Sequence, residues 1–516
     1  MTVLSRRTAL RLLGAAPVAA GAVAATSGTA YARSPGLAER IQGIIDQPVF
    51  HGSHWGMAFY APDTDEIVYA ANPAELFVAG SSLKVFIAGT AFEALGASHR
   101  FRTRIRRTGP VVRGVLRGDL VLVAGGDLLL AGRSRPDGTL LLPDTDPSYP
   151  GQPPLPDPLR EIRGLAGQVA AAGVRRVDGR VLVDISLFAE AREGIAFNDT
   201  MITVSPMMVG DNVVHAVVTP GAAAGEPGVV RSAVPTNHVR FVSQVQTVAG
   251  APARQLAVTD DVINPDGTHT VTVTGDIPVG APTQYTSYFV LSPTTYAAAV
   301  LTEALRARGV HVDGAGVGGH PRGPALAEHV SLPLSEQVKP MLKSSSNVHT
   351  ATFPYVVGAG SVSPKETYEQ YRRQLFRAAG LDPDPAGATD GKYTAETFIK
   401  FLAHMRRRPY FTPFHRALPI LGRDGSLAGN QPNSPAAGHV YAKTGTAMMM
   451  APSGVGVVNK ALAGYIELPN GRWLTFAQFM NQEGDMNAAR DLAGKAQEAM
   501  AEIAAAVYET LGRTSR

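Results

Sequence analysis

Apolar residues near the beginning of the chain follow first the spacing of strands and then that of a helix. Apolar runs at 54–60 and 66–71 flank a segment of turn-forming residues at 62–65, which predicts a β-hairpin. The next apolar run begins at Val78 and predicts a buried helix that ends near Gly96. The hairpin therefore leads directly into a helix.

The last third of the chain has a similar mixture of helix and strand. Helical spacing predicts three helices, at 366–379, 395–407 and 486–511. The apolar face of the last helix is expected to cover a sheet. A strand is predicted at 440–446. Two further strands, 461–468 and 472–479, are joined by Asn470-Gly471, the strongest short signal for a hairpin.

The long region between these two parts is predicted to be mainly β. Its first half contains a proline-rich segment at 143–158, which predicts an exposed loop, and helical spacing at 159–169. Asp178-Gly179 predicts a hairpin turn between two of its strands. The strands of this half are predicted at 111–116, 119–123, 174–177 and 180–185.

The second half of this region is almost entirely β up to residue 277 and then helical at 296–308. Residues 314–319 match the glycine spacing of dinucleotide-binding loops, but His320-Pro321 follows where that motif requires a helix. We therefore predict a turn at this position. The strands of this half are predicted at 213–218, 239–245, 256–262 and 268–274.

Length and composition indicate a globular protein of more than one domain. Of its 516 residues, 45% are hydrophobic and 17% charged, which is typical of a folded chain. The net charge of +4 includes three arginines in the first 11 residues, so nothing suggests a nucleic-acid partner. Cysteine is absent, which excludes disulfides and thiol catalysis.

Residues 1–32 are predicted to be a signal peptide. Arg6 and Arg7 resemble a twin-arginine signal, and Ala30-Tyr31-Ala32 fits a cleavage site. The intervening apolar stretch, 12–25, is too short and too rich in glycine and alanine for a membrane span. We expect an extracytoplasmic protein, exported by the Tat route in preference to Sec, with at most peripheral membrane contact.

Three short motifs in a fixed order supply the candidate chemistry. Ser81 and Lys84 form a Ser-x-x-Lys pair, which a helix would place on one face. A buried lysine near another cation can lose its proton and act as the base for a serine nucleophile. Ser345 and Asn347 form Ser-x-Asn, and Lys443 begins Lys-Thr-Gly. Ser-x-x-Lys and Lys-Thr-Gly each occur once, so chance explains this ordered set poorly.

These motifs resemble those of penicillin-binding proteins and serine β-lactamases. Three flanking segments resemble more specifically the low-molecular-mass class C penicillin-binding proteins, the D-alanyl-D-alanine carboxypeptidase/endopeptidase family. They are Gly125-Gly126-Asp127, 206–212 and 424–427. The resemblance covers nearly the whole chain after the leader. It departs at Ser346, where an aspartate is frequent, and at 389–393, where the family often has a longer glycine-rich stretch.

The resemblance implies an α/β (α+β) fold with a β-lactamase/transpeptidase-like catalytic domain. Its five-stranded antiparallel sheet lies between helices, and a large, mostly β insertion follows the first motif. We expect the catalytic domain at 36–97 and 329–516 and the insertion at 98–328. Within the insertion, an inner β domain at 210–283 is expected to interrupt a second domain formed by 98–209 and 284–328.

The resemblance also implies a role for each motif residue. Ser81 is the expected nucleophile and Lys84 its base, while Ser345 passes a proton to the leaving amine and Lys443 keeps Lys84 deprotonated. The expected oxyanion hole is the backbone N–H of Ser81 and of Thr446. The other expected substrate contacts are Asn347, Thr444 and Gly445. Peptidoglycan stem peptides are the implied substrates and β-lactams the implied covalent inhibitors.

Two other classes of protein share part of this pattern. A serine β-lactamase has the same motifs, whereas a non-enzymatic muropeptide-binding protein keeps the pocket without turnover. The intact motif residues argue against the second class. Against the first, no glutamate between Lys84 and Ser345 has asparagine four residues on, the segment by which class A β-lactamases activate water. No cofactor or metal is predicted, because His349, His404 and His415 lack metal-ligand spacing.

Overall fold

The computed structural model describes residues 31–32, 35–195, 200–319, 323–450, 455–485 and 488–513. Of the predicted signal peptide, residues 1–30 lie outside these described residues. Met486 and Asn487, the first two residues of the last predicted helix, and His320 to Arg322, which follow the predicted turn, also lie outside them.

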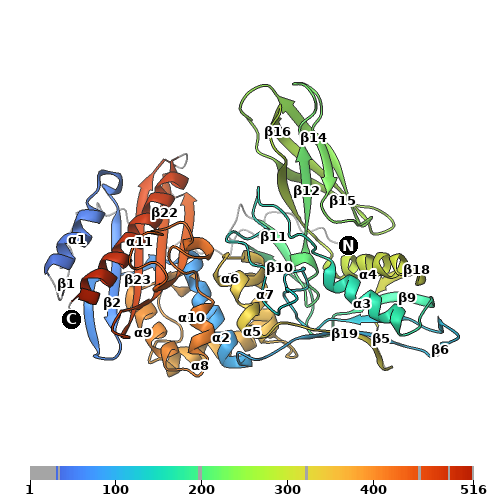
Figure 1. Ribbon diagram of the computed structural model, residues 1–516, viewed down its shortest axis with the longest axis horizontal. Coiled ribbons are helices and arrows are strands. Elements are labelled where there is room, and N and C mark those ends of the chain that lie inside the picture. The colour runs from blue at the N-terminus through green and yellow to red at the C-terminus, as the bar shows by residue number, and fades with distance from the viewer. Residues whose placement is uncertain are drawn as a thin grey trace, which may run out of the picture.

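A six-stranded antiparallel sheet organises one of the two lobes of the molecule (Figure 1). Five of its strands are long and one has only two residues, so the predicted five-stranded antiparallel sheet is confirmed. In spatial order the strands are β1 (Tyr31–Ala32), β3 (Glu66–Ala71), β2 (His54–Ala61), β23 (Trp473–Gly484), β22 (Gly456–Glu467) and β21 (Val440–Met450). Both hairpins predicted at the two ends of the chain are therefore present.

Helices cover both faces of this sheet, because its central strands are apolar on both sides. On β22, Leu462 packs into a core with α1 (Pro35–Ile45) and α11 (Ala489–Arg513), while Ala461 and Ala463 pack into a second core on the other face. The prediction that the last helix covers the sheet is confirmed. The helices on the opposite side are α2 (Lys84–Leu95), α7 (Asn347–Val357), α8 (Pro364–Ala378), α9 (Ala395–Arg406) and α10 (Phe411–Arg416).

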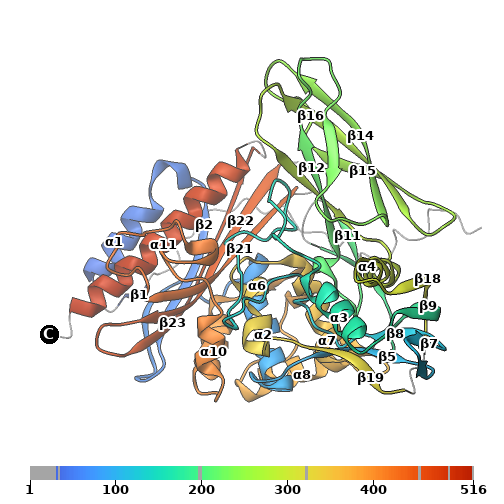
Figure 2. The ribbon, with the colours of Figure 1, turned by 45° about the vertical axis from the view of Figure 1, so that its right-hand side comes forward.

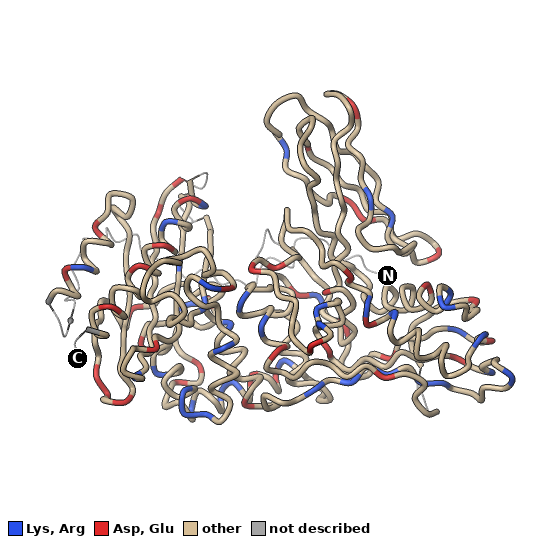
Figure 3. The backbone as a smooth tube through the Cα atoms, in the orientation of Figure 1, with Lys and Arg blue, Asp and Glu red and all other residues tan. Residues whose placement is uncertain are grey.

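Helix α2 lies at the centre of the second core. Phe86 contacts the rings of Phe376, Phe398 and Phe401, which come from α8 and α9. These aromatic contacts fix the position of the helix that carries Lys84. Basic and acidic residues both occur in each lobe (Figure 3), although residues 100–117 carry arginines and no acidic residue.

The second lobe is built on a seven-stranded mixed sheet covered by α3 (Arg160–Ala171) and α4 (Pro293–Ala307). Ile162 and Leu165 of α3 pack on Leu122 and Val181 of the sheet. The helices predicted at 159–169 and 296–308 are therefore present. The strands of the sheet are β5 (Arg102–Arg107), β6 (Val111–Val112), β7 (Val115–Leu116), β8 (Leu120–Val123), β9 (Arg176–Asp184), β18 (His311–Val317) and β19 (Ala325–Val330).

Two small sheets project from this lobe, away from the rest of the molecule in both views (Figures 1 and 2). Their shared core consists of small apolar residues such as Ala216, Val245 and Val273. All four strands predicted between 213 and 274 are present. The first sheet contains β12 (Val213–Thr219), β13 (Val229–Ser232) and β17 (Gln284–Phe289), and the second β14 (Val239–Val248), β15 (Ala257–Ile263) and β16 (His269–Pro278).

The hairpin predicted at Asp178-Gly179 is wrong, because β9 runs straight through both residues. A Cβ on Gly179 would lie 2.6 Å from the carbonyl oxygen of Gly118 and 2.4 Å from Oδ1 of Asp119. The glycine therefore permits a close approach between two segments instead of a turn. The same short sequence signal has both uses, and only the tertiary structure distinguishes them.

Two other local predictions are also wrong. The strand predicted at 111–116 is a tight hairpin of β6 and β7, which turns at Arg113 and Gly114, both at positive φ. The turn predicted at 314–319 is mostly strand, because β18 continues to Val317 in parallel pairing with β9. Positive φ begins only at Gly318.

The two lobes share a core that crosses the proposed chain boundaries near residues 97 and 328. Leu128, Phe188 and Met208 from the proposed insertion pack with residues of α2 and α7 in the second core of the first lobe. The boundaries of the insertion and of its inner domain remain a proposal. The shared core makes contact between the lobes part of the fold.

Replacing Gly179 by alanine is expected to destabilise the protein by about 1–3 kcal/mol, because the added methyl group overlaps backbone atoms of a neighbouring segment. Gly164→Ala is the matched control. Gly164 lies exposed inside α3, and apart from its chain neighbours and the backbone of its own helix no atom lies within 4 Å of the place that a methyl group would occupy. Alanine there should therefore stabilise by about 0.5–1 kcal/mol. Chemical denaturation of both variants measures the difference, and equal stabilities would contradict this account of Gly179.

Candidate active site

Ser81 lies in a tight turn that immediately precedes α2. The turn is the 3₁₀ segment η2 (Gly80–Leu83), and Gly80 enters it with φ of +51°, a conformation that favours glycine. Ser81 is half-buried, and its hydroxyl has no hydrogen-bond partner among the described residues. The hydroxyl is therefore free to meet a ligand.

Strand β21 passes unusually close to this turn. A Cβ on Gly80 would lie 3.0 Å from the backbone nitrogen of Thr446, and a Cβ on Gly445 would lie 2.3 Å from the carbonyl oxygen of Ala79. Glycine on both sides thus brings the backbone of Thr446 beside Ser81. β21 is also the last strand of its sheet. Residues 419–421 pair with its beginning, at Val440 and Ala442, so its outer edge is open only beyond Ala442 within the described part of the chain.

The segment containing Ser345 crosses the site between α6 (Lys339–Leu342) and α7. Ser345 has φ of +60°, which is unusual for a residue other than glycine. Its carbonyl oxygen accepts hydrogen bonds from Nζ of Lys84 and from the hydroxyl of Tyr149, each 2.6 Å long. Ser346 caps α7 by accepting a hydrogen bond from the backbone N–H of His349.

Residues from all three motifs meet at the hydroxyl of Ser345. Nζ of Lys84 lies 3.1 Å from this oxygen, and Nζ of Lys443 lies 2.9 Å from it. Lys84 also donates to Oδ1 of Asn347 at 2.7 Å. The structure therefore brings together Lys84, Ser345, Asn347 and Lys443, and it places the turn of Ser81 one helical turn before Lys84.

Both lysines of this cluster are buried, and burial changes their protonation. Burial lowers the pKa of Lys84 to about 7, although the carboxylate of Asp146 opposes this shift. Burial, followed by the charges of Lys84 and Lys460, lowers the pKa of Lys443 well below its usual range. For Lys84, burial and not the neighbouring cation is the main cause. A neutral lysine amine is thus available near pH 7.

The two threonines expected to contact substrate lie close together on β21 but in different surroundings. Thr444 is buried, and its hydroxyl shares a 2.7 Å hydrogen bond with the hydroxyl of Ser426. Thr446 is exposed, and its hydroxyl accepts a 2.7 Å hydrogen bond from Lys460 on β22. Both hydroxyls are therefore held by polar partners behind the edge strand.

The loop predicted to be exposed at 143–158 is partly buried in the site. Asp146, Pro147 and Ser148 are buried, and Tyr149 reaches the carbonyl oxygen of Ser345. The prolines correctly indicated a segment without helix or strand, but they carried no information about burial. The expectation of an exposed loop is wrong for this central part.

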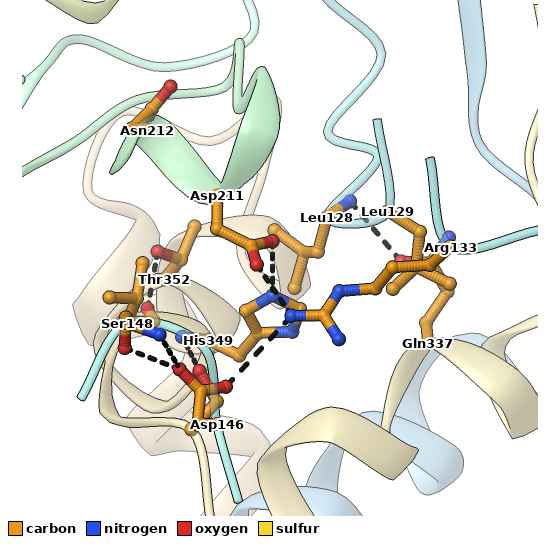
Figure 4. A network of polar contacts seen from close by, with 12 residues as sticks. Leu128, Leu129, Arg133, Asp146, Ser148, Asp211, Asn212, Gln337, His349 and Thr352 are labelled. Carbon is orange, nitrogen blue, oxygen red and sulfur yellow. Dashed lines mark hydrogen bonds and ion pairs between the residues drawn. The ribbon is translucent and has the colours of Figure 1, made fainter. Parts of the chain in front are cut away.

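A buried ion-pair network lies beneath this loop (Figure 4). The guanidinium of Arg133, which is fully buried, donates to Asp211 at 2.5 Å and lies 4.0 Å from Asp146. Nε2 of His349 on α7 lies 3.1 Å from the other oxygen of Asp211. The network therefore joins the proposed insertion to the helix that follows Ser345.

Sequence reasoning missed several residues that shape the site, namely Tyr149, Asp146, Arg133 and Lys460. Asp211 lies in the flanking segment 206–212, which suggested the family but no role for the carboxylate. Lys460 had one available signal, because it is a cation within an apolar strand. The other residues lie in irregular segments, where no periodicity predicts a neighbour.

A solved protein shares this arrangement of elements over nearly its whole length. Penicillin binding protein 4 (dacB) from Haemophilus influenzae matches with a TM-score of 0.67 at 21% identity, covering 93% of this chain and 100% of that chain. Its complex with a novel β-lactam matches with a TM-score of 0.63 at 20% identity, covering 93% of this chain and 99% of that one. The fold is therefore that of a penicillin-binding protein.

Sequence comparison identifies the family. The sequence model of the D-Ala-D-Ala carboxypeptidase 3 (S13) family matches residues 37–507. A D-alanyl-D-alanine carboxypeptidase from Actinomadura sp. (strain R39) is 30% identical over 503 residues, covering 90% of this chain and 83% of that protein. The D-alanyl-D-alanine carboxypeptidase DacB from Haemophilus influenzae is 24% identical over 414 residues, covering 75% and 77%. The chain belongs to the D-Ala-D-Ala carboxypeptidase 3 (S13) family, as predicted, and is a serine-type hydrolase.

The described residues contain no group of three or more histidines, aspartates and glutamates placed to hold a metal ion. Within the same residues, no helix is both long enough and apolar enough to cross a membrane.

Asp211→Asn is expected to destabilise the protein by about 3–5 kcal/mol, because it leaves the buried charge of Arg133 with only the more distant carboxylate of Asp146. Burial alone would raise the pKa of Asp211, but Arg133 and His349 hold that pKa well below its usual range. The stabilisation is therefore present above about pH 4, the pKa of an unfolded aspartate, and is lost as the pH falls further.

Asp313→Asn provides the control, because Asp313 pairs with Arg176 on the exposed surface of the second lobe. Removing that pair should change stability by less than about 1 kcal/mol. Urea denaturation at pH 7 and at about pH 3, below the unfolded pKa, measures both variants. Equal, small losses for the two variants would show that the buried network does not support the fold.

Proposed function

We propose that the protein is a serine D-alanyl-D-alanine carboxypeptidase and endopeptidase that acts on peptidoglycan stem peptides through an acyl-enzyme at Ser81. The observation that carries this proposal is the convergence of Lys84 and Lys443 on the hydroxyl of Ser345, with Lys84 also bonded to Asn347, beside the turn of Ser81. The fold, the family and the expected motif residues all favour the same chemistry.

In the proposed acylation step, the hydroxyl oxygen of Ser81 attacks the carbonyl carbon between two D-alanine residues. The neutral amine of Lys84 takes the hydroxyl proton, for which a pKa of about 7 is suitable. The backbone N–H groups of Ser81 and Thr446 stabilise the oxyanion, which is consistent with the close approach of β21 to the turn. Ser345 then passes a proton to the amine of the leaving D-alanine.

Substrate binding is assigned to the open edge of β21. The peptide adds to this edge as a further strand, and Asn347 holds an amide of its backbone. Thr444 and Lys443 receive the terminal carboxylate. Gly445 is assigned to allow the close approach of the peptide. Its lack of a side chain also lets the strand lie against the turn of Ser81, because a Cβ there would collide with Ala79 and Ser82.

β-Lactams are proposed as covalent inhibitors, because they present a reactive carbonyl to the same serine. The related penicillin binding protein 4 from Haemophilus influenzae is known in complex with a β-lactam, which supports this assignment. The substrate places the protein outside the cytoplasm, in the cell envelope or secreted, and agrees with the predicted leader. No nucleic-acid partner and no cofactor are proposed.

The pH dependence of acylation tests the role of Lys84. Labelling by a fluorescent penicillin should become faster as the pH rises through about 7, because only the neutral amine accepts a proton. Above about pH 7, Lys84→Ala should slow labelling by roughly 10²–10⁴ and remove this pH dependence, and Ser81→Ala should abolish labelling. Lys400→Ala, on the exposed surface of α9, is the control. Normal labelling of Lys84→Ala would assign the base to another group.

The turnover of penicillin distinguishes this function from that of a β-lactamase. After peptide cleavage the D-alanine departs and admits water, whereas the opened β-lactam stays attached and blocks that approach. Penicillin should therefore be opened once per enzyme molecule and then very slowly, while D-alanine is released repeatedly from suitable peptides.

Ring opening and D-alanine release are measured on the same preparation. Sustained fast ring opening without D-alanine release would identify a β-lactamase. Binding of muropeptides without any acylation of Ser81 would identify a non-enzymatic binding protein. Either result would contradict the proposed function.

A further inference from the structure

Lys460 is a buried cation that the proposed mechanism does not use. It lies on β22 opposite Thr446 of β21, with 5% of its surface exposed. Its ammonium group donates to the hydroxyl of Thr446 and to Oε1 of Gln497 on α11, each at 2.7 Å. Within the described residues, no carboxylate forms an ion pair with Lys460. Because an unpaired buried charge is costly, the presence of this lysine requires an explanation.

The direction of the hydrogen bonds that Lys460 donates explains its presence. An ammonium group can only donate, so the hydroxyl oxygen of Thr446 is the acceptor. The proton of that hydroxyl is then free to be donated to another group. Thr446 is exposed on the open edge strand, so this proton is available to a ligand lying along the edge. A donor with a cation directly behind it favours an anionic acceptor.

The same network extends to the neighbouring threonine. Nε2 of Gln497 donates to the carbonyl oxygen of Ser426 at 2.9 Å, and the hydroxyl of Ser426 shares a hydrogen bond with that of Thr444. Gln497 thus connects Lys460 with the residues behind Thr444. Both threonine hydroxyls are held from the α11 side of the sheet by one continuous set of contacts.

Lys460 is the third buried lysine near the site. Lys84, Lys443 and Lys460 are all buried, and none of them forms an ion pair with a carboxylate among the described residues. Burial lowers the pKa of Lys460 only to about 8, so near pH 7 it is mostly an ammonium group that an entering anion would stabilise. The terminal carboxylate of a D-alanyl peptide is such an anion, whereas a C-terminal amide is not.

We propose that Lys460 is a positioning residue that makes the site selective for substrates with a free terminal carboxylate, by fixing the Thr446 hydroxyl as a donor toward that group. The inference rests on the proposed function and deepens it, because it names the part of the substrate that the lysine selects. Lys460 itself stays behind the strand and donates its hydrogen bonds to Thr446 and Gln497.

The test compares two substrates that differ only at the C-terminus. Diacetyl-L-lysyl-D-alanyl-D-alanine and its C-terminal amide are hydrolysed by the wild type, by Lys460→Met and by Lys460→Gln. The wild type should have the higher kcat/KM on the carboxylate. Both variants should lower the carboxylate-to-amide ratio by roughly tenfold or more, as loss of one hydrogen bond to a charged group does. The control, Lys495→Met, removes an exposed positive charge from α11 and should keep the wild-type ratio.

Two additional measurements separate positioning from mere stability. Stoichiometric labelling of Ser81 by fluorescent penicillin counts the folded sites, and the substrate ratio is independent of their number. Thr446→Val, at an exposed position, should lower the ratio as much as Lys460→Met. The double variant should lower it no further, because Lys460 acts through this hydroxyl.

An unchanged ratio in labelled Lys460→Met, or an equal loss on both substrates, would overturn the inference while the proposed function stands. If the double variant lowers the ratio by the product of the two single effects, so that Lys460→Met and Thr446→Val act independently, the inference is overturned as well. If no Lys460 variant folds, a wild-type carboxylate-to-amide ratio in Thr446→Val would by itself overturn the inference. Wild-type protein that neither labels nor hydrolyses either peptide would instead overturn the proposed function itself.

Discussion

The burial of two lysine amines around one serine hydroxyl is the interaction on which the rest of the structure depends. Lys84 and Lys443 both contact Ser345, and neither has a carboxylate ion pair among the described residues. Such a cluster is unfavourable in water-free surroundings unless the amines lose their protons or an anion arrives. The fold supplies the aromatic core around α2 and the glycine contacts of β21 that hold these groups in place. Burying these amines is locally destabilising, but it places a base and an anion-binding site beside Ser81.

The elements of the first lobe follow from local sequence patterns. Apolar alternation, Asn470-Gly471 and helical spacing predict the hairpins and helices because these signals act between residues close in the chain. Asp178-Gly179 shows the limit of the same reasoning. Its glycine is required by the approach of residue 118, a contact between segments about 60 residues apart, and not by a turn.

The residues of the candidate site were also predictable from the sequence only in part. The motifs predicted Lys84, Ser345, Asn347 and Lys443, which the structure joins through hydrogen bonds. The supporting residues come from segments that no motif marks, because their roles arise only from packing. Tyr149 holds the carbonyl of Ser345 from a loop almost 200 residues earlier, and Lys460 lies behind the strand that carries Thr446. The proposed insertion thus contributes to the geometry of the site through Tyr149 and the Arg133 network.

The protonation state of Lys84 in the free protein is the most direct measure of this account. Lysine labelled with ¹³C at Cε reports the pKa of each amine by NMR, and the Lys84→Arg variant assigns the signal among the nine lysines. The account predicts a pKa of about 7 for Lys84, caused by burial. A pKa near the value of about 10.4 for a solvated lysine would mean that the amine is charged near neutral pH, and it would contradict the proposed role of Lys84 as a base.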